Sequence, residues 1–208
     1  METTAVTRQG IPRFLDRFER VVVVLLYLFL VYRFANAVVE APINAVYLIT
    51  ELVVMLMVLC RRSTDHISAS PVDWVIAFGG TFASMMLIPG TRVEAAGVLP
   101  EAMLLVGIVI SFGAKLQLRR SFGIVAANRG VKKTGLYAMV RHPMYLGYFF
   151  VQGGMLLLNF GAWNLAVLTL WAALQIERVR AEERMLALDP IYRTHMQTTR
   201  YRLLPLVY

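Results

Sequence analysis

The stretch GLYAMVRHPMYLG, residues 135–147, joins the most basic loop of the chain to a long apolar run. Gly135 permits a turn with positive φ, and Pro143 suits the first turn of the helix expected to follow it. Arg141 and His142 then lie where the unpaired N–H groups of that helix point, a position that attracts anions. A juxtamembrane cationic anchor would explain Arg141 but not the rest of the motif, so we favour a binding site.

The composition indicates an integral membrane protein with a single domain, residues 1–208. Of these residues 58% are hydrophobic and 16% are charged, whereas soluble domains carry about 25% charged residues. The net charge of +8 comes from basic residues beside apolar runs, so we expect anionic lipid headgroups as partners and no nucleic acid. The single cysteine, Cys60, excludes an intrachain disulfide. His66, His142 and His195 lack the spacing of zinc ligands, so we expect no metal.

The apolar runs predict an all-α integral membrane fold with about six transmembrane helices and a C-terminal helical hairpin. Residues 1–20 are expected to form an interfacial segment, 21–118 four spans, and 119–208 the half that carries the motif. Arg33 is expected to snorkel to the headgroups. Glu51, near mid-depth, is either functional or paired within the bundle. The expected spans are Val21–Val39, Ile43–Cys60, Pro71–Pro89, Ala95–Leu118, Met144–Leu158 and Ala162–Ile176.

The distribution of Lys and Arg predicts the orientation of the chain. Both termini, the loop after the second span and the long basic loop Arg119–Arg141 carry positive charge, whereas the other three loops hold only Arg92. This alternation predicts that both termini and the site face the cytoplasm, in a bacterial inner membrane or its equivalent. After the last span we expect amphipathic cytoplasmic helices, including a short one at Ile191–Gln197, and an amphipathic tail that rests on the membrane or closes a pocket.

A second cluster of polar residues follows the sixth span. Arg178 and Glu182 are four residues apart and so share one helical face, while Glu183 is displaced by more than a quarter turn. One acid can therefore point into a pocket while the other pairs with a basic loop residue. Taken alone, this segment is better explained as a solvated charged helix. The hairpin, however, returns the chain to its starting level, so Arg141, His142, Tyr145, Glu182 and Glu183 are expected to converge at the cytoplasmic rim.

Together the two segments resemble a known superfamily, that of the isoprenylcysteine carboxyl methyltransferases and phospholipid N-methyltransferases. The resemblance covers roughly residues 121–205. Leu136 stands where the family often has proline, and His195 stands where a second tyrosine is usual. The residues that carry the resemblance are Gly135, Tyr137, Arg141, His142, Pro143, Tyr145 and Gly147, then Arg178, Glu182, Glu183 and Leu186, and finally Tyr192.

The resemblance implies an S-adenosylmethionine-dependent membrane methyltransferase with a helical, non-Rossmann cofactor site. By position it implies catalytic roles for Arg178, which would face the substrate, and for Glu182. The acceptor would be a lipid or a lipidated molecule that enters between the spans. The residues implied in cofactor binding are Tyr137, Val140, Arg141, His142, Tyr145, Gly147, Glu182 and Glu183.

The chemistry of the acceptor and the class of protein have alternatives. Arg178 could orient a carboxylate acceptor without a base, whereas an amine acceptor would need one, with Glu51 or Glu182 as candidates. An NADPH-dependent membrane reductase of the sterol-reductase type resembles this superfamily in its C-terminal half. A non-enzymatic lipid carrier, a small transporter or a structural scaffold would explain the spans and basic loops but not the expected cluster of His142, Glu182 and Glu183. The oligomeric state stays open.

Overall fold

The computed structural model describes residues 3–40, 43–88 and 97–204, with no side-chain description for residues 3–11, 33–40, 43–48, 50 and 51. The expected roles of the Arg33 and Glu51 side chains, and the expected loop Gly90–Glu94, lie outside the described residues. Within them the chain is helical and forms no strand. The helices are α1 (Thr3–Glu40), α2 (Ile43–Cys60), α3 (Pro71–Met85), α4 (Leu99–Leu118), the 3-10 helix η2 (Arg119–Ser121), α5 (Leu136–Met139), α6 (Pro143–Leu158), α7 (Ala162–Leu186) and α8 (Pro190–Thr198).

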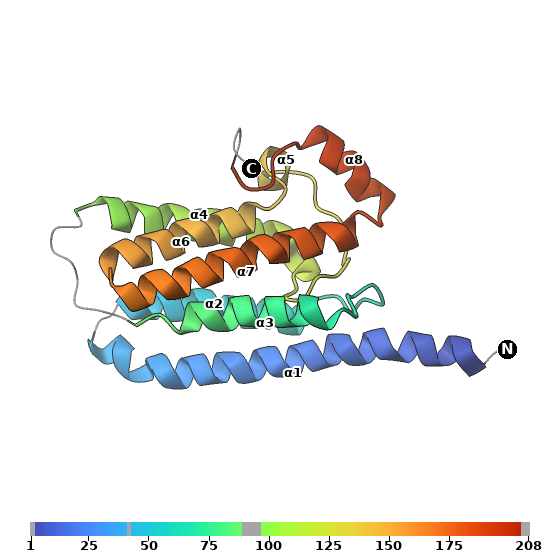
Figure 1. Cartoon of the computed structure of the whole chain (residues 1–208), viewed down its shortest axis with the longest axis horizontal. Helices are drawn as coiled ribbons and strands as arrows, with labels where there is room; N and C mark the ends of the chain where they lie inside the picture. Colours follow the sequence, from blue (N-terminus) through green and yellow to red (C-terminus); the bar gives the residue numbers. More distant parts are fainter. Residues whose placement is uncertain (1–2, 41–42, 89–96, 205–208) are drawn as a thin grey trace.

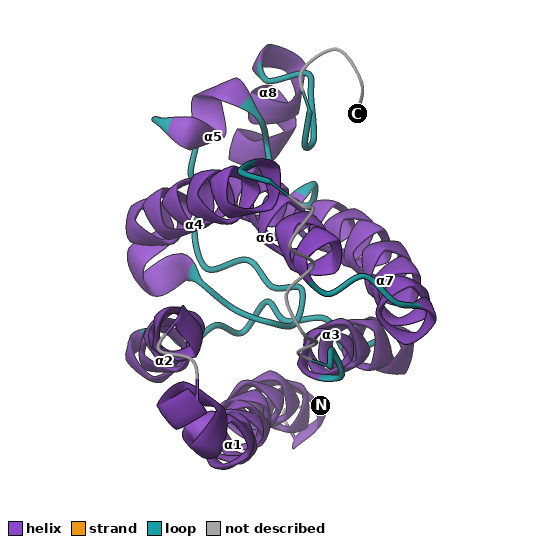
Figure 2. Ribbon diagram, turned by 90° about the vertical axis from the view of Figure 1, so that its left-hand side faces the viewer, coloured by secondary structure: helices purple, strands orange, loops and turns teal. Residues whose placement is uncertain are grey.

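The long helices lie side by side in a bundle, and the two short helices α5 and α8 cap one corner of it (Figure 1). Three pairs make the main contacts, α4 with α6, α3 with α7, and α1 with α2. Figure 2, a view along the bundle, shows α4, α6 and α7 above α1, α2 and α3, with loops running between the two groups. This arrangement brings the end of α7 close to the start of α6, as the hairpin predicted.

Glycine allows the closest of these helix contacts. A Cβ on Gly107 of α4 would lie 2.6 Å from the carbonyl oxygen of Gly147 of α6, and a Cβ on Gly147 would lie 2.5 Å from the backbone nitrogen of Ser111. The two backbones therefore pack together as only small residues permit. Gly79 and Gly80 of α3 both face Leu174 of α7, so these two helices also pack closely through small residues.

Several expected boundaries differ from those of the helices. The described part of the expected interfacial segment and the span Val21–Val39 form one continuous helix, α1, because no glycine or proline interrupts the helix after Pro12. The helix α7 likewise includes both the sixth expected span and the charged segment after it. The third span ends at Met85 rather than Pro89, and α4 begins at Leu99 rather than Ala95. The short helix expected at Ile191–Gln197 is confirmed as α8.

The chain carries the apolar surface of a membrane protein. Among the described residues one helix, Leu99–Ser121, is long and apolar enough to cross a membrane, and α6 is a shorter apolar helix. Large apolar side chains are also exposed on α1, α4 and α7, for example Leu25, Val109 and Leu170. Exposed apolar patches of this kind mark membrane contact. The set of six spans stays a prediction.

The basic loop after α4 runs through the molecule rather than along its surface. Its middle pairs with the loop after α2, where Ser68 N–H donates to Ala126 O and Asn128 N–H donates to His66 O, both at 2.9 Å. Arg129 is buried and therefore does not reach lipid headgroups. It belongs to a buried group of charged side chains, Asp16, Glu19, Arg61 and Arg129, which we term the N-terminal cluster.

Candidate functional site

The motif at residues 135–147 turns the chain from this interior loop into α6. Gly135 has a φ of +62°, and Leu136 N–H donates to Oε1 of Gln117 at 2.9 Å. A Cβ at residue 135 would lie 2.6 Å from that oxygen, so the backbone angle favours glycine and a larger residue would also displace the Gln117 side chain. As predicted, α6 begins at Pro143, with His142 at its N-cap.

Glu183 of α7 gathers three basic side chains, Arg141, His142 and Arg202, and we term these four residues the C-terminal cluster. Nε of Arg141 donates to Oε1 of Glu183 and Nε of Arg202 donates to Oε2, both at 2.7 Å. Nε2 of His142 lies 3.3 Å from Oε1. Burial would raise the pKa of Glu183, but hydrogen bonds from these three residues outweigh it and lower the pKa to about 2. Glu183 is therefore a carboxylate at neutral pH.

The segment after α8 covers this cluster. Arg141 N–H donates to Tyr201 O at 2.9 Å, and His142 N–H donates to Arg202 O at 2.8 Å. Nη1 of Arg141 also donates to the carbonyl oxygens of Thr199 and Arg200, at 2.9 and 2.8 Å. The tail was expected either to rest on the membrane or to close a pocket. Its described part closes over the motif, and Arg141 holds it there.

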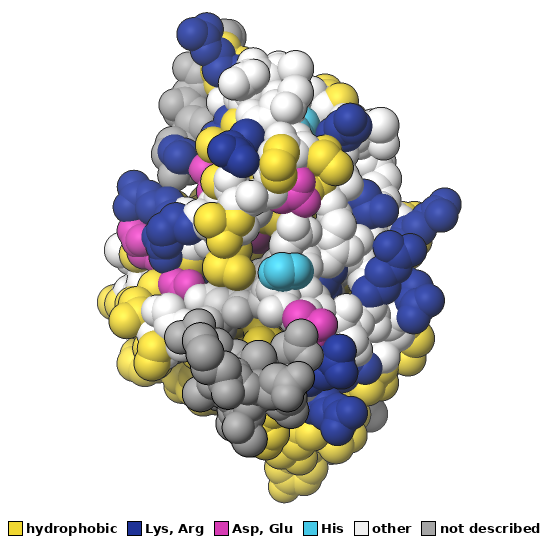
Figure 3. Space-filling model, turned by 90° about the vertical axis from the view of Figure 1, so that its right-hand side faces the viewer, with side chains coloured by type: hydrophobic (Ala, Val, Ile, Leu, Met, Phe, Trp, Pro, Cys, Tyr) yellow, Lys and Arg dark blue, Asp and Glu magenta, His cyan; other side chains and the backbone are white. Residues whose placement is uncertain are grey.

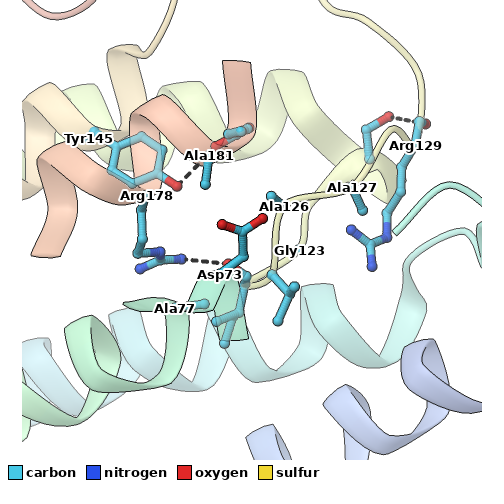
Figure 4. A pocket seen from close by; sticks show the side chains of 13 residues that line it. Asp73, Ala77, Gly123, Ala126, Ala127, Arg129, Tyr145, Arg178 and Ala181 are labelled. Atoms are coloured by element: carbon cyan, nitrogen blue, oxygen red, sulfur yellow. Dashed lines mark hydrogen bonds between the residues drawn. The ribbon is translucent and has the colours of Figure 1, made fainter. Parts of the chain in front are cut away.

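The second acid, Glu182, faces a separate cavity. Tyr145 Oη donates to Oε2 of Glu182 at 2.9 Å. The cavity lies between α3, α6, α7 and the segment Gly123–Ala127, with Asp73, Arg178 and Glu182 among its lining residues (Figure 4). The division between the two acids follows the helical offset that the sequence indicated. The partners of Glu183 come from the tail and from the motif, and one of them, Arg141, is the last residue of the expected basic loop.

Arg178 and Arg129 both line this cavity with a buried Nε that has no hydrogen-bond partner, and Arg178 is the one that the sequence placed in the site. Nη1 of Arg178 donates to Oε1 of Gln175 at 3.1 Å, and Nη2 donates to Ile124 O at 3.0 Å. Its guanidinium lies over the ring of Tyr145, 5.5 Å from the centroid. Nε is buried and has no hydrogen-bond partner. A buried donor without a partner is costly, so a ligand oxygen at this position would satisfy Arg178.

Asp73 and the Gly123–Ala127 segment are cavity residues that the sequence reasoning missed. The Asp73 carboxylate points into the cavity from the first turn of α3 (Figure 4). It accepts from Ser68 Oγ at 2.5 Å and from Nη2 of Arg184 at 2.9 Å. The sequence did offer a signal for Asp73, because an acid within an apolar stretch is costly to bury and so marks a functional candidate. The Gly123–Ala127 segment gave no signal, because its position depends on tertiary contacts.

Three other residues implied in cofactor binding, Tyr137, Val140 and Gly147, are not part of the cavity lining. Tyr137 is buried in α5, and burial together with the Glu182 carboxylate raises its pKa, so its hydroxyl stays protonated. Val140 is a buried residue in extended conformation within the motif, directly before Arg141. Gly147 lies in the contact between α4 and α6, where its absence of a side chain serves helix packing. Their assignment to cofactor binding stays a prediction.

His195 replaces the tyrosine that the resemblance led us to expect and lies on the inner face of α8. Its ring packs edge-on against Tyr192, with centroids 5.8 Å apart, and Tyr192 Oη lies 3.5 Å from Nε2 of His142. Burial, followed by the charge of Arg141, lowers the pKa of His195, so the imidazole is neutral at pH 7. The imidazole thus provides an aromatic contact within α8, against Tyr192, whose hydroxyl lies beside His142 of the C-terminal cluster.

The donor set fits an amino-acid-bearing nucleoside such as S-adenosylmethionine. Carboxylates at residues 182 and 183 suit ammonium or hydroxyl groups, and the free Nε of Arg178 suits a carboxylate. The size of the cavity fits a nucleoside less well than its polar groups do. The space within it that water centres can occupy is about 20 Å³, which is enough for one or two water molecules. A nucleoside must therefore displace side chains. Arg202, whose side chain is 34% exposed, can leave Glu183 for water.

Comparison with known proteins agrees with the sequence motif. Residues 98–188, a little under half of the chain, match the family model of the isoprenylcysteine carboxyl methyltransferase family. The match includes α4, α5, α6 and α7. It therefore includes the motif at residues 135–147 and the polar segment with Arg178, Glu182 and Glu183, but not the tail. No curated protein matches the chain. Among the described residues, no group of His, Cys, Asp and Glu side chains could hold a metal ion.

Proposed function

We propose that the protein is a membrane methyltransferase using S-adenosylmethionine, because residues 98–188 match the family model of the isoprenylcysteine carboxyl methyltransferase family. The methyl acceptor is a lipid or a lipidated molecule, and transfer takes place at the cytoplasmic face. One observation carries the proposal. Tyr145 and Glu182 border the same cavity as Arg178, one turn from the C-terminal cluster, so donors and acceptors for both reactants lie together.

In this proposal the protein positions the reactants and excludes water, because S-adenosylmethionine supplies a methyl group already activated by its sulfonium. Glu182 and Glu183 hold the amino group or the ribose hydroxyls, and His142 helps to hold the methionyl carboxylate. Arg178 faces the acceptor. A carboxylate acceptor would be oriented by Arg178 alone, whereas an amine would pass its proton to Glu182.

The proposal includes the placement of the chain in the membrane. Helices α1, α2, α3, α4, α6 and α7 form the six spans, with both termini and the site on the cytoplasmic side. Lys and Arg side chains spread around the edges of the end of the molecule shown in Figure 3, with acidic side chains between them. This distribution supports contact with anionic headgroups at that end.

Two experiments test the proposal, the first by separating it from the NADPH-dependent reductase. S-adenosylhomocysteine should raise the thermal midpoint of the purified protein in detergent, and NADPH should leave it unchanged. A rise with NADPH alone would replace the methyltransferase by the reductase. In the second experiment the protein is incubated with methyl-labelled S-adenosylmethionine and total membrane lipid. We expect label in a lipid or lipidated product, and mass spectrometry of that product would identify a methyl ester or an N-methyl amine. An absence of labelled product would contradict methyl transfer to these acceptors.

A further inference from the structure

The N-terminal cluster joins the cavity wall to a helix outside the family-matched region. Asp16 and Glu19 project from α1 and meet two arginines, Arg61 after α2 and Arg129 in the interior loop. The ion-pair distances range from 2.7 to 3.1 Å, and every one of these side chains is at most 2% exposed. Charges so deeply buried need partners of opposite sign, and each acid here contacts both arginines.

The two acids differ in what else they hold. Glu19 Oε1 accepts the backbone N–H of Ile124 at 2.7 Å and that of Val125 at 3.0 Å. Hydrogen bonds to an ionised acceptor are roughly twice as strong as neutral ones. The Asp16 side chain bonds to Arg20, Arg61 and Arg129 and to no backbone amide of this segment. Glu19 is thus the link from α1 to the segment.

The same segment is held from its other side by the candidate site. Ile124 O accepts from Nη2 of Arg178. Because Ile124 O and Val125 N–H belong to the same peptide group, this group connects the Glu19 carboxylate to the Arg178 guanidinium. A Cβ on Gly123 would overlap the guanidinium of Arg129, so glycine is needed where the segment meets the N-terminal cluster. Gly123 and Ala126 lie across the cavity from Arg178 (Figure 4).

We propose that Glu19 is a positioning residue of the methyl-transfer site, fixing the Gly123–Ala127 wall and, through Ile124, the orientation of Arg178. This inference rests on the proposed function for its catalytic consequence, but the structural link can be measured without substrate. Arg61 and Arg129 orient the Glu19 carboxylate through their ion pairs with it. A helix outside the family-matched region thereby sets the geometry of a site whose other polar residues lie mostly within that region.

The link is tested by amide hydrogen exchange on the full-length protein, without ligand. In Glu19→Ala, peptides covering residues 122–128 should exchange about tenfold faster than in the wild type, because two amides lose their acceptor. Asp65→Asn removes an exposed pair that α1 makes elsewhere, between Arg13 and the loop after α2, and should leave these peptides unchanged. Unaltered exchange in Glu19→Ala would overturn the link.

The catalytic consequence is tested by steady-state methyl transfer at a temperature where all variants are folded. Glu19→Ala should lower kcat about tenfold with little change in the KM for S-adenosylmethionine, because a misplaced group slows the reaction more than it weakens binding. Glu19→Gln should recover part of the loss, since its amide oxygen can still accept both N–H groups. Asp16→Asn should keep kcat near the wild-type value despite losing stability.

Gly123→Ala also displaces the Gly123–Ala127 segment, because the added Cβ would overlap the Arg129 guanidinium. It should lower kcat by a similar factor, so it tests the same role if Glu19→Ala does not fold. A loss of kcat in Asp16→Asn equal to that in Glu19→Ala would overturn the positioning role, because general loosening would then explain both. A wild type without methyl transfer would instead contradict the proposed function, and the exchange experiment would still decide whether Glu19 holds the wall.

Discussion

The two buried ionic clusters use the same chemistry but differ in their access to water. The four side chains of the N-terminal cluster are at most 2% exposed, and their link to water is Arg20, which is 27% exposed and pairs with Asp16 at 3.3 Å. The C-terminal cluster reaches water through its own member Arg202, which is 34% exposed and holds Glu183 at 2.7 Å. The two arginines of the N-terminal cluster itself cannot leave without unfolding their surroundings. The C-terminal cluster can give up Arg202 and offer Glu183 to a ligand. The difference teaches that burial alone does not mark a binding site, and that an exchangeable partner does.

The largest effect should come from removing one charge from the N-terminal cluster. Asp16→Asn leaves two buried arginines with a single carboxylate, so we expect a loss of about 3 kcal/mol in the free energy of unfolding. Glu183→Gln should lose less, about 2 kcal/mol, since Arg202 can turn into water. Chemical denaturation in detergent measures both, and Asp65→Asn, in an exposed pair, should lose less than about 0.5 kcal/mol. Equal losses at Asp16 and Glu183 would contradict the contrast between the clusters.

The next effect concerns Arg178, which lies between the two clusters. Arg178→Ala should lower the turnover of methyl transfer about 100-fold, as expected when a charged donor facing the reacting group is lost. The affinity for S-adenosylhomocysteine should change by less than about threefold, since the proposed role is toward the acceptor. Radiolabelled methyl transfer and calorimetry measure the two quantities. Arg180→Ala, at a half-exposed arginine of the same helix, is the control, and equal turnover in both variants would remove the role of Arg178.

A smaller effect should distinguish the acids of α7. Glu182→Gln and His142→Ala should each weaken the binding of S-adenosylhomocysteine about tenfold, because each removes one polar contact to the ligand. Glu177→Gln, at an exposed acid on the same helix that pairs with Arg180, should bind with wild-type affinity. Calorimetric titration of the three variants provides the comparison. Wild-type affinity in both site variants would refute the site assignment.

The smallest effect is a pH dependence of stability from Glu183. Its pKa is about 2 in the folded protein and 4.5 ordinarily. A lowered pKa stabilises the folded state fully above 4.5, and this contribution is lost as the pH falls from 4.5 toward 2. Lowering the pH from 7 to 4 should therefore remove about 1 kcal/mol that depends on Glu183. Denaturation curves of the wild type and Glu183→Gln at both pH values measure it; the same loss in the variant would assign it to other groups.

The local parts of the site were predictable because they depend on short-range geometry. Gly135 at positive φ, Pro143 at the start of α6 and the separate directions of Glu182 and Glu183 follow from rules that act over a few residues. The convergence of the motif with Glu183 needed one further step, the return of the hairpin. The prediction that the 1–20 segment is separate from the first span was wrong, since a change in polarity does not break a helix.

The amino-acid sequence by itself determined the helical class, the membrane character, the resemblance to a methyltransferase family and the pairing of an Arg-His-Pro motif with two acids. These features depend on composition, on hydrophobic runs and on spacing within a few turns. Only the tertiary structure decided that Asp16 and Glu19 turn inward to two arginines, that Asp73 lines the cavity and that the tail closes over Arg141. Those contacts join residues separated by up to 113 positions, and no local rule specifies which distant partner a buried charge will find.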